Sequence, residues 1–164
     1  MAKVELRKHQ AKNAKRLFEI LSNPNFTYFT ACPKSVKAEA EWLKECPNKS
    51  KINLEHNFAI FYDDKLVGGC GIKINQHRKH EGEIGYFLDE AYWGKGIVPK
   101  AVRKLEKIGF GKLQLKRIEI LMNPKNKASE KVAKKCRYKK EGTMKKVIKS
   151  KENYWNAHLY AKVK

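Results

Sequence analysis

Residues 91–102, AYWGKGIVPKAV, place two glycines one residue apart, between an aromatic pair and a stretch with helical spacing of apolar residues from Ile97 onward. The first turn of a helix has backbone N–H groups without intrahelical partners, and these lie at the positive end of the helix dipole. Gly94 and Gly96 remove side chains that would keep an anion away from such groups. The stretch therefore predicts a phosphate-binding turn in front of a helix.

This turn differs from the two common nucleotide-binding loops. No Gly-Lys-Ser/Thr sequence follows at the spacing of a Walker A loop, and the third glycine of the dinucleotide fingerprint is absent. Because two glycines before a helix are a weak signal by themselves, the assignment depends on the segments on either side.

The length of 164 residues predicts a single domain over residues 1–164. No apolar run approaches the roughly 20 residues of a membrane-spanning helix, and the first ten residues lack the apolar centre of a signal peptide. We therefore expect a cytoplasmic protein without a membrane partner, either a monomer or a homodimer. The four cysteines form no Cys-x-x-Cys pair, and His77 and His80 have no accompanying ligand pattern, so no metal site is expected.

The net charge of +20 is concentrated in the second half of the chain. Residues 1–90 carry 15 Lys and Arg against 12 Asp and Glu, whereas residues 91–164 carry 22 against 5. Such a field attracts an anionic partner, and a phosphorylated cofactor, RNA and an acidic protein surface are the alternatives. Lysines that serve only solubility or thermal stability are a further alternative.

Helical and strand patterns alternate along the chain, without an internal repeat or a low-complexity linker. Apolar residues at helical spacing predict helices over 9–23, from Ser35 to Pro47, from Gly96 onward and over 126–136. Apolar and β-rich runs predict strands at 3–6, on either side of a turn at 63–65, over 81–89, over 117–123 and on either side of a turn at 150–153. This order predicts an α/β or α+β fold in which helices pack on a mixed sheet.

Several segments in this order resemble the RimJ/RimL-type branch of the GNAT N-acetyltransferases. They are FAIFYDDKLVGGCGI (58–72), EIGYFLDEAYWGKGIVPKAV (83–102), NPKNKASEKVAKKCRYKKEGTM (123–144) and NAHLYAKV (156–163). The resemblance covers nearly the whole chain. It implies a mixed, mostly antiparallel seven-stranded sheet with helices on both faces. It also implies transfer of an acetyl group from acetyl-coenzyme A to an amine, with no metal involved.

The cofactor loop of that family has the pattern Gln/Arg-x-x-Gly-x-Gly/Ala, which falls here on Trp93, Gly94, Lys95, Gly96, Ile97 and Val98. The resemblance implies that the backbone amides of this loop bind the pyrophosphate, although Val98 departs from the small residue usual at the last position. It also implies that the preceding strand separates from its parallel neighbour at Phe87 and Leu88. A backbone N–H near Leu88 would then hydrogen-bond the acetyl carbonyl and stabilise the charge that grows there.

Asn126 and Ser129 match the Asn-x-x-Ser signature of the family at the head of the next helix. The resemblance implies that Asn126 contacts the cofactor arm and that Ser129 protonates the departing thiolate. An N-cap and a residue of the same first turn are the purely structural alternative. Many members use a tyrosine where Ala133 stands here, and Arg137 replaces a usual glycine, which we expect to reshape that turn.

An acceptor amine with a pKa of about 10 must lose a proton before it attacks. In RimL-like enzymes a late glutamate has this role, but its position falls here on Ile148, which cannot act as a base. Glu83 resembles the strand glutamate that serves as the base in histone-type acetyltransferases. We therefore expect Glu83 to be the base, with a partly exposed strand carboxylate as the alternative.

The resemblance implies a protein N-terminus as the acceptor, as in the ribosomal-protein enzymes of the branch, with a ribosome, RNA or an acidic protein as partner. A small amine is an alternative, but the lysines between residues 125 and 151 would repel a polyamine. A GNAT fold that binds the cofactor without transferring the acetyl group is a second alternative. The third alternative is a basic RNA-binding module that displays Tyr138, Tyr154 and Trp155 on an exposed sheet.

Overall fold

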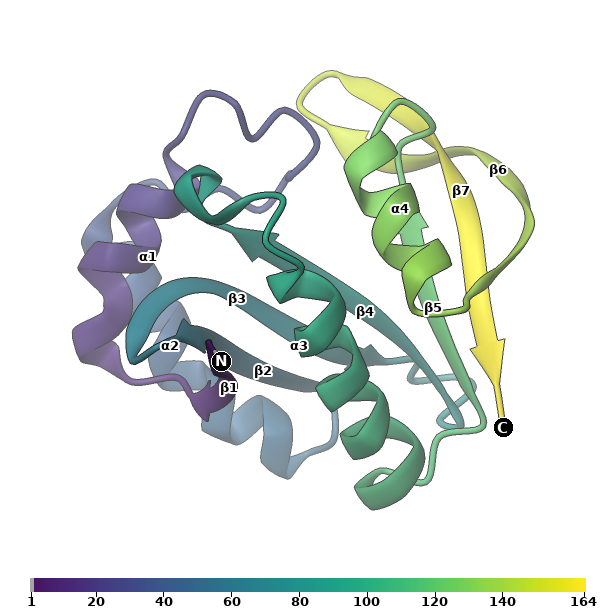
Figure 1. The fold of residues 1–164 in the computed structure, drawn as a ribbon, viewed down its shortest axis with the longest axis horizontal. Coiled ribbons are helices and arrows are strands. Elements are labelled where there is room, and N and C mark those ends of the chain that lie inside the picture. Colours follow the sequence, from purple (N-terminus) through teal and green to yellow (C-terminus); the bar gives the residue numbers. More distant parts are fainter. Residues whose placement is uncertain (1) are drawn as a thin grey trace.

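The computed structural model describes residues 2–164 (Figure 1). Its strands are β1 (Val4–Lys8), β2 (Glu55–Tyr62), β3 (Lys65–Ile74), β4 (Glu81–Leu88), β5 (Arg117–Met122), β6 (Lys139–Ser150) and β7 (Asn153–Val163). Its helices are α1 (Ala14–Leu21), α2 (Val36–Lys51), α3 (Ile97–Glu106) and α4 (Lys127–Lys135). Short 3-10 turns occupy Ala11–Asn13 and Glu90–Tyr92, and a π-helical segment, Lys107–Lys112, continues α3.

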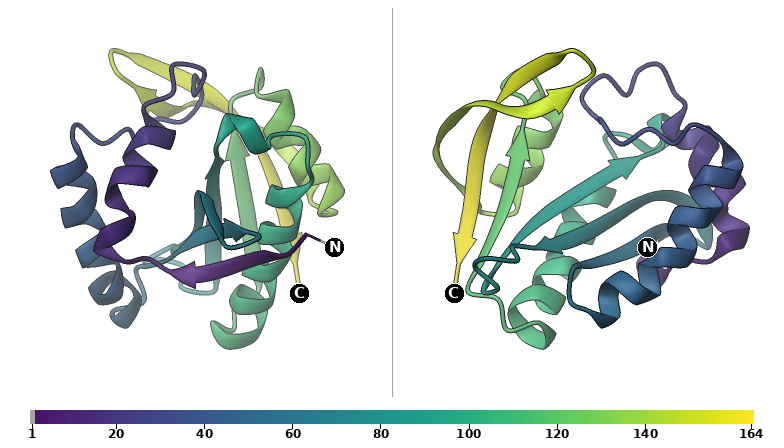
Figure 2. Two further views of the ribbon diagram at one scale, coloured as in Figure 1. Left: turned by 60° about the vertical axis from the view of Figure 1, so that its left-hand side comes forward. Right: turned by 180° about the vertical axis from the view of Figure 1, so that it is seen from behind.

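The seven strands form one sheet in the order β1-β2-β3-β4-β5-β7-β6. Only the central pair β4 and β5 is parallel, and the other pairs are antiparallel. Helices α1 and α2 lie on one face of the sheet, while α3 and α4 lie on the other (Figures 1 and 2). The mixed, mostly antiparallel sheet with helices on both faces is the architecture expected from the sequence.

Two apolar cores hold these layers together. The larger core lies under α3 and α4 and includes Ile97 and Leu105 of α3 and Ile118 and Ile120 of β5, all with at most 1% of their surface exposed. The smaller core joins α1 and α2 to the other face through Leu17 and neighbouring side chains. Burial alternates strictly along β5, as the period-2 pattern predicts.

Two turns contain residues other than glycine in the left-handed backbone region. Asp63 and Asp64 join β2 to β3 with φ of 45° and 62°, which is the left-handed pair of a tight hairpin turn and confirms the predicted turn at 63–65. Arg137 follows α4 with φ of 63°, and Tyr138 N–H bonds to the carbonyl of Ala133. This is the regular helix-ending turn in which glycine is usual, so the expected reshaping does not occur.

One expectation and one alternative concerning single residues prove wrong. Helix α2 does not stop at Pro47 but continues to Lys51, because packing of the helix and the bond from Ile52 N–H to Asn48 O outweigh the one bond that proline lacks. Tyr138 is 4% exposed, packed in the larger core, so it cannot stack on a nucleic acid base.

Candidate active site

The glycine turn has the form that an anion site requires. The Asp89 carboxylate caps the 3-10 turn by accepting from Ala91 N–H at 3.1 Å, and an ion pair with Arg16 anchors Asp89 to α1. Gly94 and Gly96 then take φ of 76° and 70°, in the left-handed region that favours glycine. Because Gly96 is the N-cap of α3 and has no side chain, the first N–H groups of this helix face outward unobstructed.

The parallel pair β4 and β5 separates in the direction of this turn. Their pairing ends at Glu83 and Glu119, and the remaining part of β4 has β3 as its partner on one side only. Asp89 N–H bonds to the carbonyl oxygen of Val67 on β3. Because successive N–H groups of a strand point to opposite sides, the N–H of Leu88 points away from β3, into the gap. The strand end thus offers an unshared backbone donor at the position expected from the sequence.

A cleft of about 990 Å³ fills this gap and extends along the N-terminal end of α3. It is lined by β4, β5, the turn before α3, the start of α4, the loop between α1 and α2, and part of β6. It brings together nearly all the predicted site residues, namely Glu83, Phe87, Leu88, Trp93, Gly94, Gly96, Ile97, Val98, Asn126 and Ser129. Val98 packs half-buried against the larger core at the edge of this cleft.

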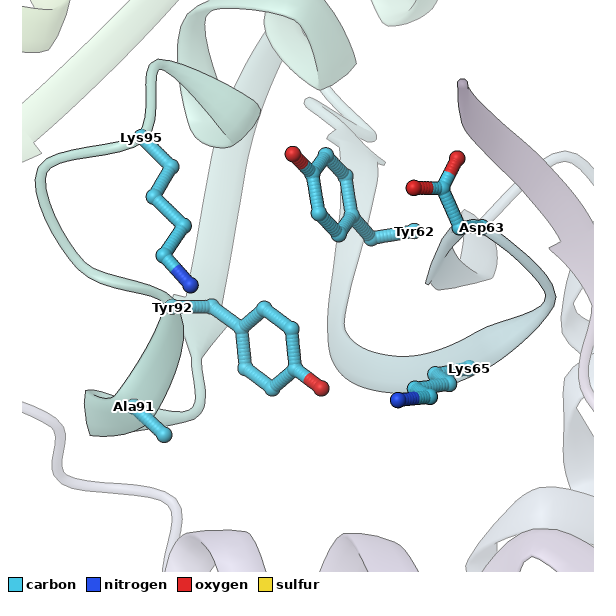
Figure 3. A pocket seen from close by; sticks show the side chains of 6 residues that line it. All are labelled: Tyr62, Asp63, Lys65, Ala91, Tyr92 and Lys95. Carbon is cyan, nitrogen blue, oxygen red and sulfur yellow. The ribbon is translucent and has the colours of Figure 1, made fainter. Parts of the chain in front are cut away.

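Lys95 is the exception among the predicted residues. Its amine lies 4.9 Å from the ring centre of Tyr92, beside a separate shallow hollow of about 400 Å³ that Tyr62, Asp63 and Lys65 also line (Figure 3). The side chain therefore lines this hollow and does not line the cleft. Only the main chain of Lys95 is placed to contact an anion at the start of α3.

The start of α4 carries a helix-capping residue, Asn126, and a hydroxyl group, that of Ser129. Asn126 Oδ1 accepts from Ser129 N–H at 3.1 Å, as expected of an N-cap. Ser129 is 8% exposed, and its hydroxyl lies 2.6 Å from the hydroxyl of Tyr86 on β4. Burial, as the main cause, raises the pKa of Tyr86 to about 12, so this phenol is protonated at neutral pH. The sequence did not reveal Tyr86, which lay within an ordinary strand pattern.

Glu83 lies in the cleft at the point where β4 and β5 part. Its side chain remains in contact with solvent, yet the surrounding protein atoms remove enough water to raise its pKa above the ordinary value. Glu119 adds to this increase, while Lys73 opposes it. A carboxylate with a raised pKa is a better proton acceptor than an ordinary one.

The walls of the cleft contain two groups that sequence reasoning missed. The loop between α1 and α2 places Phe26 in a stack on Trp93, with ring centres 6.1 Å apart, and Tyr28 edge-on to Trp155 of β7 at 6.4 Å. The loop thereby reaches the tip of the β6–β7 hairpin (Figure 2). Three lysines of α4, at positions 127, 131 and 135, line the cleft on one side of the helix. Their spacing of four residues could have revealed this row in the sequence, because residues four apart lie on the same side of a helix.

No group of three or more metal-ligating side chains occurs within residues 2–164. Among the same residues, no helix is long and apolar enough to cross a membrane. Cys46, Cys70 and Cys136 are buried free thiols, whereas Cys32 is exposed.

Comparison with known proteins identifies the family to which this chain belongs. Residues 3–139 match the acetyltransferase (GNAT) domain family. The chain belongs to the GNAT acetyltransferases. An uncharacterized N-acetyltransferase, p20, of Bacillus licheniformis is 30% identical over 99% of this chain and 93% of its own length. The ribosomal-protein-serine acetyltransferase of Escherichia coli is 30% identical over 65% of this chain and 59% of its own length.

Solved GNAT structures share the fold. The microcin C7 self-immunity acetyltransferase MccE, in complex with acetyl-CoA and AMP, superposes with a TM-score of 0.88 at 22% identity, over 99% of this chain and 93% of that one. The L7/L12 N-acetyltransferase RimL, in complex with coenzyme A, gives 0.87 at 20% identity over 98% and 93%. These structures show the shared fold. The family match and the relative p20 identify this chain as an acetyl-CoA-dependent N-acetyltransferase, so the expected cofactor and reaction class are confirmed.

Proposed function

We propose that this GNAT enzyme acetylates the α-amino group at the N-terminus of a protein with acidic residues nearby. The observation that carries the proposal is the position of β6, a sheet-edge strand rich in exposed lysines that also lines the cleft through Val147, Ile148 and Lys149. An acidic segment lying along this edge would present its terminus to the cleft.

The charge of β6 has few internal partners. Its five lysines, at positions 139, 140, 145, 146 and 149, are all exposed, and none forms an ion pair within residues 2–164. Glu141, the one acidic residue of the strand, is already paired with Arg117. The unpaired lysines create a positive field beside the entrance, which attracts carboxylates and repels a polyamine.

The residues of the cleft supply the parts of the reaction. The N–H groups at the start of α3 bind the pyrophosphate of the co-substrate, with Asn126 contacting its arm, and acetyl-coenzyme A supplies an activated thioester. Glu83 accepts the proton of the incoming amine. The N–H of Leu88 stabilises the charge that grows on the acetyl oxygen, and Ser129 gives a proton to the sulfur.

The relatives supply a second line of support. Besides the Escherichia coli enzyme, a putative ribosomal N-acetyltransferase, YdaF of Bacillus subtilis, is 27% identical over 85% of this chain and 79% of its own length. Both relatives are named as ribosomal acetyltransferases, which favours a protein terminus over a small amine as the acceptor.

Thiol release from acetyl-coenzyme A tests the proposal with three acceptors at equal concentration. They are an acidic peptide with a free N-terminus, the same peptide with a blocked N-terminus and an internal lysine, and spermidine. We expect the free-terminus peptide to have the highest kcat/KM, and this value to fall as salt screens the β6 lysines. Faster reaction with the blocked peptide or with spermidine would contradict the proposal.

A further inference from the structure

The phenol of Tyr86 and the hydroxyl of Ser129 meet at the floor of the cleft, coming from different elements. Tyr86 rises from β4, and Ser129 lies in the first turn of α4, with 2.6 Å between the two oxygens. Both residues line the cleft. On α4 itself the position one turn after Ser129 is Ala133, fully buried and without any polar group. The strand thus brings a phenol to a place where the helix has none.

We propose that Tyr86 is a positioning residue, which fixes the hydroxyl of Ser129 so that its hydrogen points to the sulfur of the leaving thiol. This inference deepens the proposed function and rests on the role given there to Ser129. A serine hydroxyl has one hydrogen and rotates freely unless another group determines its direction. When Tyr86 donates to the Ser129 oxygen, the serine hydrogen is available only for another acceptor.

The direction of the Tyr86–Ser129 bond follows from the surroundings. The Tyr86 oxygen lies 3.5 Å from the Ser129 carbonyl oxygen as well as 2.6 Å from its hydroxyl, and a carbonyl can only accept. A phenol hydrogen directed to this pair is therefore favoured over the reverse arrangement. The raised pKa of Tyr86 agrees with this, because the phenol remains a donor throughout the neutral range.

The proton balance of the step is complete with these two groups and water. The amine nitrogen bonds to the acetyl carbon, the carbon–sulfur bond breaks, and its electron pair remains on sulfur. Ser129 gives its hydroxyl proton to the sulfur and receives the Tyr86 proton, and Tyr86 takes one from cleft water. The proton lost by the amine returns to water through Glu83. No oxidant, metal or further reactant is needed.

A double-mutant cycle separates this role from simple packing. We expect Tyr86→Phe to lower kcat about five- to tenfold with KM for acetyl-coenzyme A changed less than about twofold. In a Ser129→Ala background the same change should have almost no further effect, since the group being positioned is gone. An equal loss of kcat in both backgrounds, or an unchanged kcat for Tyr86→Phe alone, would overturn the proposal.

Tyr138→Phe is the matched control. Tyr138 is also a buried tyrosine of the larger core, and its hydroxyl has no hydrogen-bond partner within residues 2–164. It does not line the cleft. Loss of this hydroxyl should leave kcat unchanged, which shows that removing a core phenol does not by itself reduce the rate.

A second measurement needs no acceptor, so it decides the role of Tyr86 even if the proposed acceptor is wrong. Coenzyme A labelled with ¹³C next to its sulfur is bound to each protein, and the thiol is titrated by NMR. A hydrogen bond from Ser129 stabilises the thiolate, so the thiol pKa should be about half a unit to one unit higher in Tyr86→Phe than in the wild type. Equal thiol pKa values in the two proteins would overturn the inference.

Discussion

The indole N–H of Trp93 donates a hydrogen bond to the carbonyl oxygen of Leu88, with 2.8 Å between nitrogen and oxygen. The N–H of the same Leu88 faces the gap between β4 and β5. The bond therefore ties the glycine turn, which we propose binds the pyrophosphate, to Leu88, whose N–H we propose binds the acetyl oxygen. It holds two parts of the proposed cofactor site in one fixed relation.

Trp93→Phe should weaken acetyl-coenzyme A binding about fivefold. Phenylalanine can keep the stack on Phe26 but loses the hydrogen bond to Leu88, which is worth about 1 kcal/mol. Calorimetric titration with acetyl-coenzyme A measures the change in Kd. Trp42→Phe, on α2 and outside the cleft, is the control and should bind as the wild type does. An unchanged Kd for Trp93→Phe would show that the tie is unimportant.

Gly96→Ala should impair both folding and cofactor binding. Its φ of 70° is strained for alanine, at a cost of about 1 kcal/mol or more, and the added methyl group projects from the N-cap of α3. Gly111→Ala is the control, because there too a Cβ meets nothing within 4 Å, but φ is not positive. Thermal unfolding with and without acetyl-coenzyme A separates the effects. If acetyl-coenzyme A raises the unfolding temperature of Gly96→Ala as much as that of the wild type, the turn at Gly96 does not bind the pyrophosphate.

The pH dependence of kcat/KM should report Glu83. A base must be ionised, so kcat/KM should fall as the pH drops below the raised pKa of this carboxyl. Glu119→Gln removes a charge that raises this pKa, so the acidic limb should move to lower pH; Lys73→Met should move it to higher pH. Glu83→Gln should lower kcat about 100-fold. An unchanged rate across pH in Glu83→Gln would exclude it as the base.

His9 should make stability depend on pH. Burial lowers its pKa to about 4, below the value of about 6.5 in the unfolded chain, and its Nδ1 has no hydrogen-bond partner within residues 2–164. The folded state therefore favours the neutral ring, so the stabilisation is complete above pH 6.5 and is lost as the pH falls toward 4. The loss amounts to at most about 3 kcal/mol.

Comparison with His9→Phe isolates this contribution. The variant can keep an aromatic ring beside Trp42, whose ring centre lies 5.8 Å from that of His9, but it cannot be protonated. Denaturant unfolding at several pH values should show the wild type losing stability relative to the variant between pH 6.5 and 4. Parallel curves for the two proteins over this range would contradict the account.

Arg137→Gly should stabilise the fold by about 1 kcal/mol. Arg137 has φ of 63° in the turn that ends α4, a conformation that glycine adopts without steric cost. Arg137→Ala keeps the Cβ and should bring no such gain. Chemical denaturation of the three proteins gives the comparison, and equal stability of the glycine and alanine variants would argue against strain at this position.

Much of the fold was predictable because its signals are local. Period-2 and helical patterns identified the seven strands and four helices, and the turn at Gly94 and Gly96 was evident from residue type. Pro47 misled because residue type does not show the contacts beyond it, in which Lys49 and Ser50 bond to Glu55 and His56 of β2. Tyr86 was missed because its partner, Ser129, is 43 residues away in sequence, and only the tertiary fold brings the first turn of α4 next to Tyr86. The orientation of Lys95 likewise depends on Tyr92.

The site of acetylation in a single peptide shows whether the enzyme acts on a protein N-terminus. An acidic peptide with a free α-amine and one internal lysine is incubated with the enzyme and acetyl-coenzyme A, and fragment mass spectrometry locates the acetyl group. We expect the α-amine to be acetylated and the lysine to remain unmodified. Two results would contradict the proposed acceptor. One is acetylation of the lysine alone, and the other is no acetylation of this peptide by an enzyme that acetylates another amine.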